Sequence, residues 1–458
     1  MNRIRRELPA TLTLAVPIVV GQLAQMSIGL TDTAFIGRLG ELPLAAAAFT
    51  AGIFGMFYVV GVGLLSGASV CTARDHGAGN VAGSAAWLRH GRVFALAVGL
   101  SALGALVLLS TQFAALHQPA RVVAIVRPFF LLVAASLVPA LLFQVQRQFA
   151  EAVGQARGPM LIIFSSVALN ALLNWALIFG HWGCPPLGLV GSGWSTLIAR
   201  SWSVLACGVW LHISPRFAAV RSARRDGWQR ARFLTLLGIG VPTGAMLLFE
   251  TGAFSASALL MGWLGELPLA AHQVALSCAS FTFMVPLGLS HAVSVRISRA
   301  RGAGQERSLL AIGWGALVTG LTLMLAFALM FALAGGALAA LFTPASEVVS
   351  LARQLLMVAA VFQIFDGAQV ISVGALRGLT DVRLPMVITF VAYWLISLPL
   401  GYWLAFHAGF GAVGLWIGLA AGLGSAAVAL LGRFHVKARR YSLEQADSSN
   451  LHIEKTTP

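Results

Sequence analysis

Twelve long apolar stretches divide this chain, and they constrain its fold more than any other feature of the sequence. Each is close to the roughly 20 predominantly apolar residues that an α-helix needs to cross a bilayer. None shows the ten-residue alternation of a membrane β-barrel strand. We therefore predict an all-α integral membrane protein with twelve transmembrane helices. The stretches lie at approximately residues 10–35, 46–72, 92–114, 126–148, 160–181, 188–212, 234–262, 270–295, 309–333, 347–376, 386–408 and 411–433.

The basic residues of the chain gather on one side of these stretches. The formal net charge is +15, although only 10% of the residues are charged. Almost all Lys and Arg residues fall in the loops and tails on the side of the N-terminus, and the other side receives only Arg38, Arg121, Arg127 and Arg353. By the positive-inside rule, both termini are expected to be cytoplasmic. The distribution of basic residues thus indicates the membrane topology, and we expect no nucleic-acid partner.

Several kinds of site are not expected. The charged start runs into the first apolar stretch without a small-residue cleavage site, so that stretch should remain in the membrane. The four cysteines, Cys71, Cys184, Cys207 and Cys278, lack CxxC or Cys/His spacing and are expected to pack as small residues. The histidines show no HExxH spacing, and a membrane-embedded hydrolase would need a nucleophile, a base or a metal cluster. We predict neither an enzyme nor a bound cofactor.

The two halves of the chain repeat one pattern. Pro17 and Pro242 lie 225 residues apart, and GELPLAA occurs at residues 40–46 and again at 265–271. The segments GAGN and GAGQ, at 77–80 and 302–305, share that offset. This indicates an internal duplication of six spans, with two lobes related by a pseudo-two-fold axis along the membrane normal.

We expect four parts from this repeat. They are an N-lobe of helices 1–6 at 1–212, a cytoplasmic linker at 213–233, a C-lobe of helices 7–12 at 234–435 and a disordered cytoplasmic tail at 436–458. Pro17 and Pro242 should each kink a helix.

Three carboxylates, Asp32, Glu250 and Asp366, lie in the apolar stretches, whereas the other acids fall in loops, span ends or tails. An acid at the centre of a span costs roughly 3 kcal/mol on insertion scales, so it persists where it is buried, paired, protonated or facing water. The repeat does not duplicate these acids, because Glu250 aligns with Gln25 and Asp32 with Ser257. They are therefore candidates for function rather than scaffold.

The motifs around these acids resemble one transporter family. The first helix reads PIVVGQLAQMSIGLTDTAFIGRLG, the seventh VPTGAMLLFETGAF and the tenth FQIFDGAQVISVGALRGLTDVRLPM. The chain resembles the multidrug and toxic compound extrusion (MATE) family over roughly residues 8–435, and its NorM-like branch most. The resemblance implies a bacterial inner-membrane antiporter that exports organic cations and drugs by alternating access, in exchange for Na⁺ or H⁺. It also implies a monomer whose only ionic requirement is the coupling ion.

The resemblance implies a role for each of the three acids. Asp32 matches the acidic position in the first helix of the N-lobe, while Glu250 and Asp366 match the C-lobe cation site. Two positions depart from relatives. The fifth helix has Asn170 and Asn174 where DinF-like members have an aspartate, which argues against a pure N-lobe proton relay. Phe362 stands where some Na⁺-coupled members have a tyrosine, which weakens the case for Na⁺.

The residues themselves support a C-lobe site. Glu250 and Asp366 each lie near the middle of a span, and two converging carboxylates can coordinate Na⁺ with nearby oxygen atoms. Alternatively, desolvation and mutual repulsion leave one carboxyl protonated near neutral pH. Further polar and aromatic side chains are candidates for lining a drug cavity, although hydrogen bonds between helices and ordinary packing explain them equally well. They are Gln25, Asn170, Asn174, Gln273, Phe281 and Gln369.

The sequence leaves two other classes of transporter possible. A lipid-linked oligosaccharide flippase would need a strongly cationic cavity, whereas only Arg200 lies clearly within a span. A major-facilitator transporter also has two parallel six-span halves, but the loop RDHGAGN lacks that family's usual charged motif.

Overall fold

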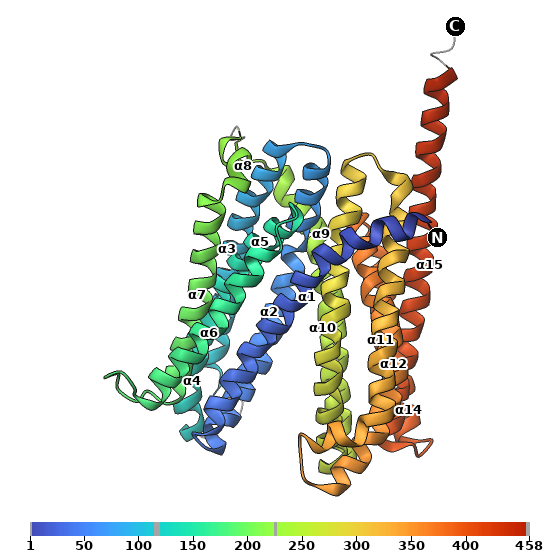
Figure 1. Ribbon diagram of the computed structural model, residues 1–458. Helices are drawn as coiled ribbons and strands as arrows, with labels where there is room; N and C mark the ends of the chain where they lie inside the picture. The colour runs from blue at the N-terminus through green and yellow to red at the C-terminus, as the bar shows by residue number, and fades with distance from the viewer. Residues whose placement is uncertain (1, 114–119, 224–226, 455–458) are drawn as a thin grey trace. The chain divides into compact units, whose positions relative to one another are not determined.

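The described part of the chain folds into helices. The computed structural model describes residues 2–113, 120–223 and 227–454, and within these ranges it contains no β-strand. Within these residues, twelve helical segments are long and apolar enough to cross a membrane, which confirms the predicted number of spans. Figure 1 labels the helices along the chain.

In the first half of the chain, six spans comprise seven helices. Ser136 separates α4 from α5, and together these two helices make the span Ile125–Ala152. The helices are α1 (Asn2–Gly37), α2 (Glu41–Gly77), α3 (Val81–Thr111), α4 (Ala120–Ala135), α5 (Leu137–Ala152), α6 (Arg157–Phe179) and α7 (Leu189–Ile213). The predicted linker contains a 3₁₀ turn at Pro215–Phe217 and α8 (Ala218–Ser222).

The second half repeats this order of spans. A π-helical turn, Val391–Ser397, lies between α13 and α14, and the three segments form the span Arg383–Phe406. The helices are α9 (Arg230–Leu264), α10 (Glu266–Gly302), α11 (Leu309–Ala340), α12 (Ser346–Gly378), α13 (Arg383–Phe390), α14 (Leu398–Phe406) and α15 (Gly411–Glu454), with a 3₁₀ turn at Glu306–Ser308.

The two compact units of the structure exchange the beginnings of two helices, which corrects the lobe boundaries predicted from the sequence. One unit contains residues 20–244, and the other contains residues 1–19 together with 245–458. The boundaries therefore fall inside α1 and α9, rather than in the linker, and they are themselves 225 residues apart. Each comes two residues after a proline, Pro17 or Pro242, which cannot donate a backbone hydrogen bond.

Close helix contacts hold both exchanged ends in place. A Cβ atom added to Gly63 of α2 would lie 2.5 Å from the Cα of Gly244 in α9. A Cβ atom added to Gly288 of α10 would lie 2.9 Å from the Cα of Val19 in α1. Gly63 and Gly288 occupy the same position in the repeat. Only glycine permits backbones to approach this closely, so the repeat preserves the contact that receives each exchanged helix.

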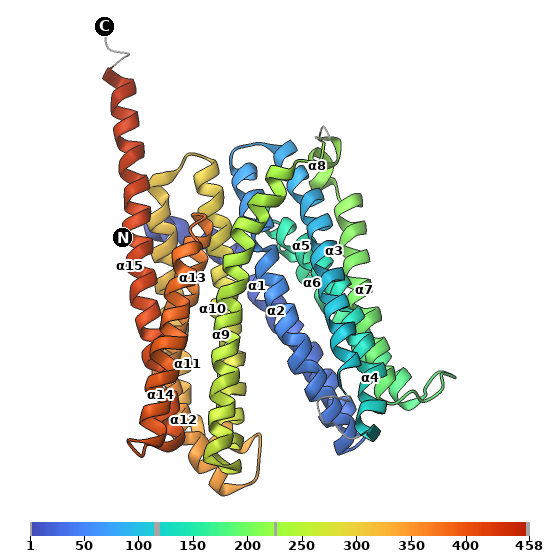
Figure 2. The ribbon, with the colours of Figure 1, turned by 180° about the vertical axis from the view of Figure 1, so that it is seen from behind.

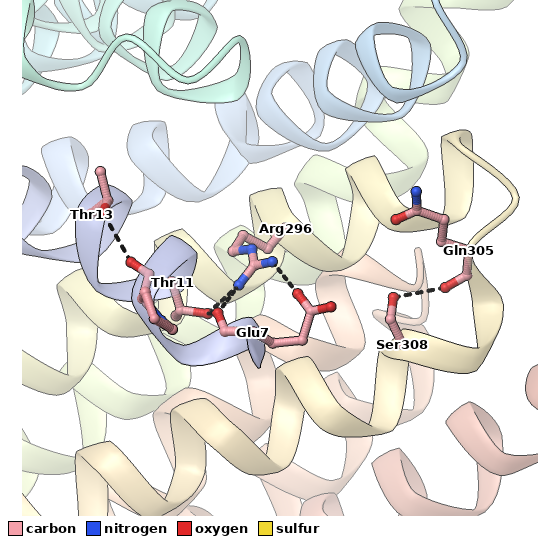
Figure 3. A network of polar contacts seen from close by, with 7 residues as sticks. Glu7, Thr11, Thr13, Arg296, Gln305 and Ser308 are labelled. Atoms are coloured by element: carbon pink, nitrogen blue, oxygen red, sulfur yellow. Dashed lines mark hydrogen bonds and ion pairs between the residues drawn. The ribbon is translucent and has the colours of Figure 1, made fainter. Parts of the chain in front are cut away.

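A polar cluster also anchors the beginning of α1 to α10 (Figure 3). The guanidinium group of Arg296 forms an ion pair with the Glu7 carboxylate, and it donates to the Glu7 carbonyl and to the Thr11 hydroxyl. The first part of α1 is therefore fixed by charge as well as by packing.

The C-terminal tail is helical, contrary to the disorder predicted for residues 436–458. Helix α15 continues to Glu454 and extends past the ends of α11 and α12 (Figures 1 and 2); residues 455–458 lie outside the described part. The Arg301 guanidinium stacks 4.5 Å from the ring centroid of Tyr441, and the Ser442 hydroxyl donates to the Glu306 carbonyl at 3.0 Å. Composition alone does not reveal these contacts, which stabilise the helix beyond its apolar part.

Candidate functional site

The structure brings two of the three predicted acids together. Glu250 lies in α9, eight residues after Pro242, and Asp366 lies near the middle of α12. Asp366 is only 4% exposed and Glu250 is partly buried. The two carboxyls are close enough to repel each other when both are charged, and the hydroxyl of Tyr393 lies near both. We call Glu250, Asp366 and Tyr393 the C-terminal acid cluster.

The π-helical turn brings Tyr393 to this cluster, and an amide holds it there. The Gln369 amide donates to the Tyr393 hydroxyl at 3.1 Å, and both side chains are buried. Gln369 lies three residues after Asp366, on the same side of α12. Gln369, a predicted cavity residue, therefore positions a phenol beside the acids.

Aromatic rings close one side of the cluster. The Phe254 ring packs edge-on against Tyr393, with centroids 6.3 Å apart, and against Phe362, with centroids 6.0 Å apart. Phe362 is 2% exposed and packs in turn on Trp416. Phe362, one turn before Asp366, therefore belongs to a buried layer of aromatic rings beside the acids.

The C-terminal acid cluster has no basic partner among the described residues. No hydrogen bond or ion pair reaches either carboxyl there, and no cationic side chain acts on them electrostatically. Within those same residues, no group of three His, Cys, Asp or Glu side chains could hold a metal. Carboxylate, phenol and amide oxygens are nevertheless the hard donors that suit an alkali cation. The cluster could equally hold a proton.

Asp32 lies in a different compact unit and in a different chemical setting. One carboxylate oxygen accepts from the side-chain amides of Asn174 at 2.6 Å and Asn170 at 3.1 Å. The other oxygen accepts from the Thr196 hydroxyl at 3.0 Å. The Arg200 guanidinium acts on Asp32 electrostatically. A charged carboxylate is well satisfied by three donors and a nearby cation.

Arginine-centred contacts extend this polar setting through the same unit. Arg200 donates to the Ser136 hydroxyl at 2.7 Å and lies 4.3 Å above the centre of the Phe54 ring. The buried Arg147 donates to the carbonyl oxygens of two α1 amides, Gln22 at 3.3 Å and Gln25 at 3.1 Å. The Gln25 amide also donates to the Tyr58 hydroxyl.

Sequence reasoning missed part of this network. Glu151 was expected at a span end, but α5 continues to Ala152 and leaves Glu151 only 3% exposed. Its carboxylate lies 3.7 Å from the Nε atom of Arg147, one helical turn earlier. The spacing RQFAE at residues 147–151 places opposite charges four residues apart, and this signal could have identified the pair.

Two predicted cavity residues belong neither to the C-terminal acid cluster nor to the polar contacts around Asp32. Gln273 is exposed, and Phe281 is 52% exposed; both belong to α10. No hydrogen bond or ring contact joins them to the acids within the described residues. The other predicted candidates, Gln25, Asn170, Asn174 and Gln369, all have hydrogen-bond partners.

Comparisons with known proteins agree with this architecture. The MatE family model matches residues 17–176 and again residues 242–403, and the two matches begin 225 residues apart. Multidrug resistance protein NorM of Burkholderia vietnamiensis is 39% identical over 434 residues, which cover 93% of each chain. A probable multidrug resistance protein NorM of Mesorhizobium japonicum is 36% identical and covers 94% of each chain.

Solved structures share the fold. A crystal structure of MATE in the bent conformation aligns with a TM-score of 0.88 and 19% identity, covering 97% of this chain and 98% of that one. The eukaryotic MATE transporter AtDTX14 aligns with a TM-score of 0.83 and 22% identity, covering 97% of this chain and all of that one. The family model matches most of the chain, which decides against the major-facilitator alternative. The chain therefore belongs to the MatE family of membrane transporters.

Proposed function

We propose that the chain is a multidrug efflux antiporter, which exports organic cations and drugs in exchange for Na⁺ or H⁺ by alternating access. The observation that carries this proposal is the C-terminal acid cluster. Two carboxyls that have no basic partner in the described part of the chain lie inside the membrane-spanning part of the protein. Uncompensated charge in that environment costs several kcal/mol, so the cluster must take up cations. The names of the NorM relatives support drugs as the exported solutes.

The two acidic sites have different roles in this proposal. Glu250 and Asp366 bind the coupling cation, because no basic side chain among the described residues of their unit neutralises them. Asp32 differs in having three hydrogen-bond donors, Asn170, Asn174 and Thr196, and a weaker electrostatic attraction from Arg200, which together stabilise its charged form. A cationic drug would be attracted to such a carboxylate. We therefore assign Asp32 to drug binding and Asn170, Asn174 and Thr196 to its support.

Exchange follows from electrostatics. An organic cation that reaches the C-terminal acid cluster during transport competes there with Na⁺ or a proton, because each of these ligands removes the negative charge that attracts the other. Each ligand therefore lowers the affinity of the protein for the other, and this coupling is reciprocal at equilibrium. Tyr393 and Gln369 supply neutral oxygen atoms that complete a Na⁺ site, while the carboxyls alone suffice for protons.

Arg147 and Arg200 do not form the cationic cavity that an oligosaccharide flippase requires. A pyrophosphate headgroup would need guanidinium groups without their own counter-charges. Arg147 is paired with Glu151, and Arg200 lies in the field of Asp32. The charges of these two arginines are thus not available to a polyanion.

Efflux of ethidium from cells that express the chain tests this function. We expect Glu250→Gln and Asp366→Asn each to reduce efflux at least tenfold while the protein is still produced. Glu347→Gln is the matched control, because Glu347 is an exposed acid at the start of α12. Unchanged efflux in both cluster variants would refute the coupling role, and the absence of any drug efflux from the parent would refute the function.

Proteoliposomes identify the coupling ion. A Na⁺ gradient and a pH gradient are imposed separately, and drug uptake is measured in each case. The gradient that drives uptake in the parent should fail to do so in Asp366→Asn. If uptake survives in that variant, the coupling cation binds elsewhere.

We also propose that the protein lies in the bacterial inner membrane with both termini in the cytoplasm, as the distribution of basic residues supports. Cysteines introduced at Ser222 and Thr343, in a Cys184→Ser background, test this orientation. A membrane-impermeant thiol reagent applied to intact spheroplasts should label only the cysteine at 343. Labelling of only the cysteine at 222 would reverse the topology.

A further inference from the structure

A groove between α13 and α15 includes neither the C-terminal acid cluster nor Asp32 and its partners. It has a volume of about 690 Å³ and is open to the outside of its unit. Its walls are apolar at one end and cationic at the other. The lining residues are Leu384, Ile388, Ala429, Gly432, Arg433, Val436, Lys437, Arg440, Tyr441 and Glu444.

The order of these residues along α15 gives the groove its polarity. Ala429, Gly432 and Val436 lie on the part of the helix that ends the last apolar stretch, and Val436 is 68% exposed. The basic side chains Lys437 and Arg440 follow within the next turns. Positions three and four apart share one face of a helix, so the stripe runs from apolar to basic along a single face. This order places the basic end of the groove at the depth of the lipid headgroups.

The basic end has positive charge in excess. Asp381 accepts from Arg433 through Nε at 2.7 Å and Nη2 at 3.0 Å, and it lies 3.0 Å from the Nζ atom of Lys437. Arg440 pairs with Glu444 at 2.9 Å. Three basic residues thus face two carboxylates, which leaves one positive charge. Asp381 holds Arg433 and Lys437 in place but does not occupy all of their hydrogen-bond donors. The Nη1 group of Arg433, for example, has no partner among the described residues.

The groove is held open by fixed walls. Arg301 stacks on Tyr441 and the Glu306 carbonyl accepts from Ser442, so the end of α15 is attached to neighbouring parts of the same unit. At Gly432 an added Cβ atom would meet nothing within 4 Å. The space beside Gly432 is therefore free for a ligand.

We propose that this groove binds one anionic phospholipid. Its phosphate group accepts hydrogen bonds from Arg433, Lys437 and Arg440, and one acyl chain lies along Leu384, Ile388 and Gly432. A basic site next to an apolar groove matches the two halves of such a lipid, and each basic residue near an anionic headgroup contributes about 1 kcal/mol. The proposal rests on membrane embedding and not on the transported substrate or coupling ion.

Native mass spectrometry of the detergent-purified full chain tests this site. With phosphatidylglycerol, we expect a single tightly bound lipid in the parent. Lys437→Gln and Arg440→Gln should each weaken binding about fivefold, the equivalent of about 1 kcal/mol. Arg439→Gln is the matched control, because Arg439 is exposed on the same turn but does not line the groove. Gly432→Phe should also weaken binding, because its ring fills the space for the acyl chain.

Two further ligands separate the possible sources of the phosphate. Phosphatidylcholine should bind at least tenfold more weakly, and inorganic phosphate should not compete with phosphatidylglycerol. Equal binding of phosphatidylcholine, equal loss in Arg439→Gln, or competition by inorganic phosphate would each overturn the proposal. Binding is measured without transport, so its outcome is separate from that of the efflux experiments.

Discussion

Gly63 of α2 packs directly on Gly244 of α9, at the point where α9 passes from one compact unit to the other. A methyl group at residue 63 would lie 2.5 Å from the Gly244 Cα atom, and backbone atoms cannot move aside cheaply. We expect Gly63→Ala to destabilise the protein by about 1–3 kcal/mol, the usual cost of overpacking. Thermal unfolding in detergent should show a lower Tm.

Gly55→Ala is the matched control for this substitution. Gly55 lies in the same helix, and an added Cβ atom there meets nothing within 4 Å. Alanine favours helix, so this variant should be unchanged or up to about 1 kcal/mol more stable. Equal Tm values for the two variants would contradict a close contact at Gly63.

Removing the Tyr393 hydroxyl should weaken cation coupling. In Tyr393→Phe, Gln369 loses its partner while only 2% exposed, which costs about 1–3 kcal/mol of stability. The acid cluster also loses a neutral oxygen. We expect the cation concentration that supports half-maximal exchange to rise about tenfold if Na⁺ is the coupling ion, which corresponds to about 1.4 kcal/mol.

Drug uptake in proteoliposomes over a range of Na⁺ concentrations measures this effect. Tyr402→Phe is the control, because Tyr402 is 40% exposed and its ring packs against Phe406 and His407 rather than beside the acid cluster. An unchanged Na⁺ dependence in Tyr393→Phe would mean that the phenol does not bind the ion.

Asp32 and Arg200 should depend on each other for stability. Asp32→Asn removes the carboxylate that attracts Arg200, and Arg200→Gln removes the guanidinium that attracts Asp32. We expect each single substitution to destabilise the protein, and the double substitution to cost less than their sum by about 0.5–1 kcal/mol. Thermal unfolding of all four proteins gives this coupling. Strict additivity would show that the two charges act independently.

The ion pair between Arg296 and Glu7 should control the local order of α1. Both side chains are partly exposed, so the pair contributes about 1 kcal/mol at most. We expect Glu7→Gln to raise amide hydrogen exchange in residues 8–19 about fivefold. Arg296→Gln should do the same, whereas Arg383→Gln, at an exposed position of α13, should not. Unchanged exchange in both variants would show that packing alone fixes this segment.

The spans and the three acids can be predicted from the sequence because hydrophobic length and the cost of a buried charge are local properties. The position of Tyr393 cannot, because it depends on a π-helical turn that shifts the register of the span. In the sequence Tyr393 is one aromatic residue among many. Its role becomes visible only through Gln369 and the two acids.

The unit boundaries were also beyond sequence reasoning, for a different reason. The linker at 213–233 is the obvious place to divide the chain, since composition changes there. The actual division at 19/20 and 244/245 depends on contacts distant in sequence, such as Gly288 with Val19 and Arg296 with Glu7. Pro17 and Pro242 mark the right places, but kinks alone do not reveal which helices receive the exchanged ends.

The exchanged helix ends bear on how a chain of this kind can arise by duplication. A single 225-residue copy of the repeat would not complete its own compact unit, because the first part of its first helix belongs in a unit built by the other copy. Two unlinked copies would complete each other only as a domain-swapped dimer. Fusion through the linker converts such a dimer into one polypeptide and frees each copy to diverge. Glu250 can then arise in one half while Gln25 occupies the corresponding position in the other.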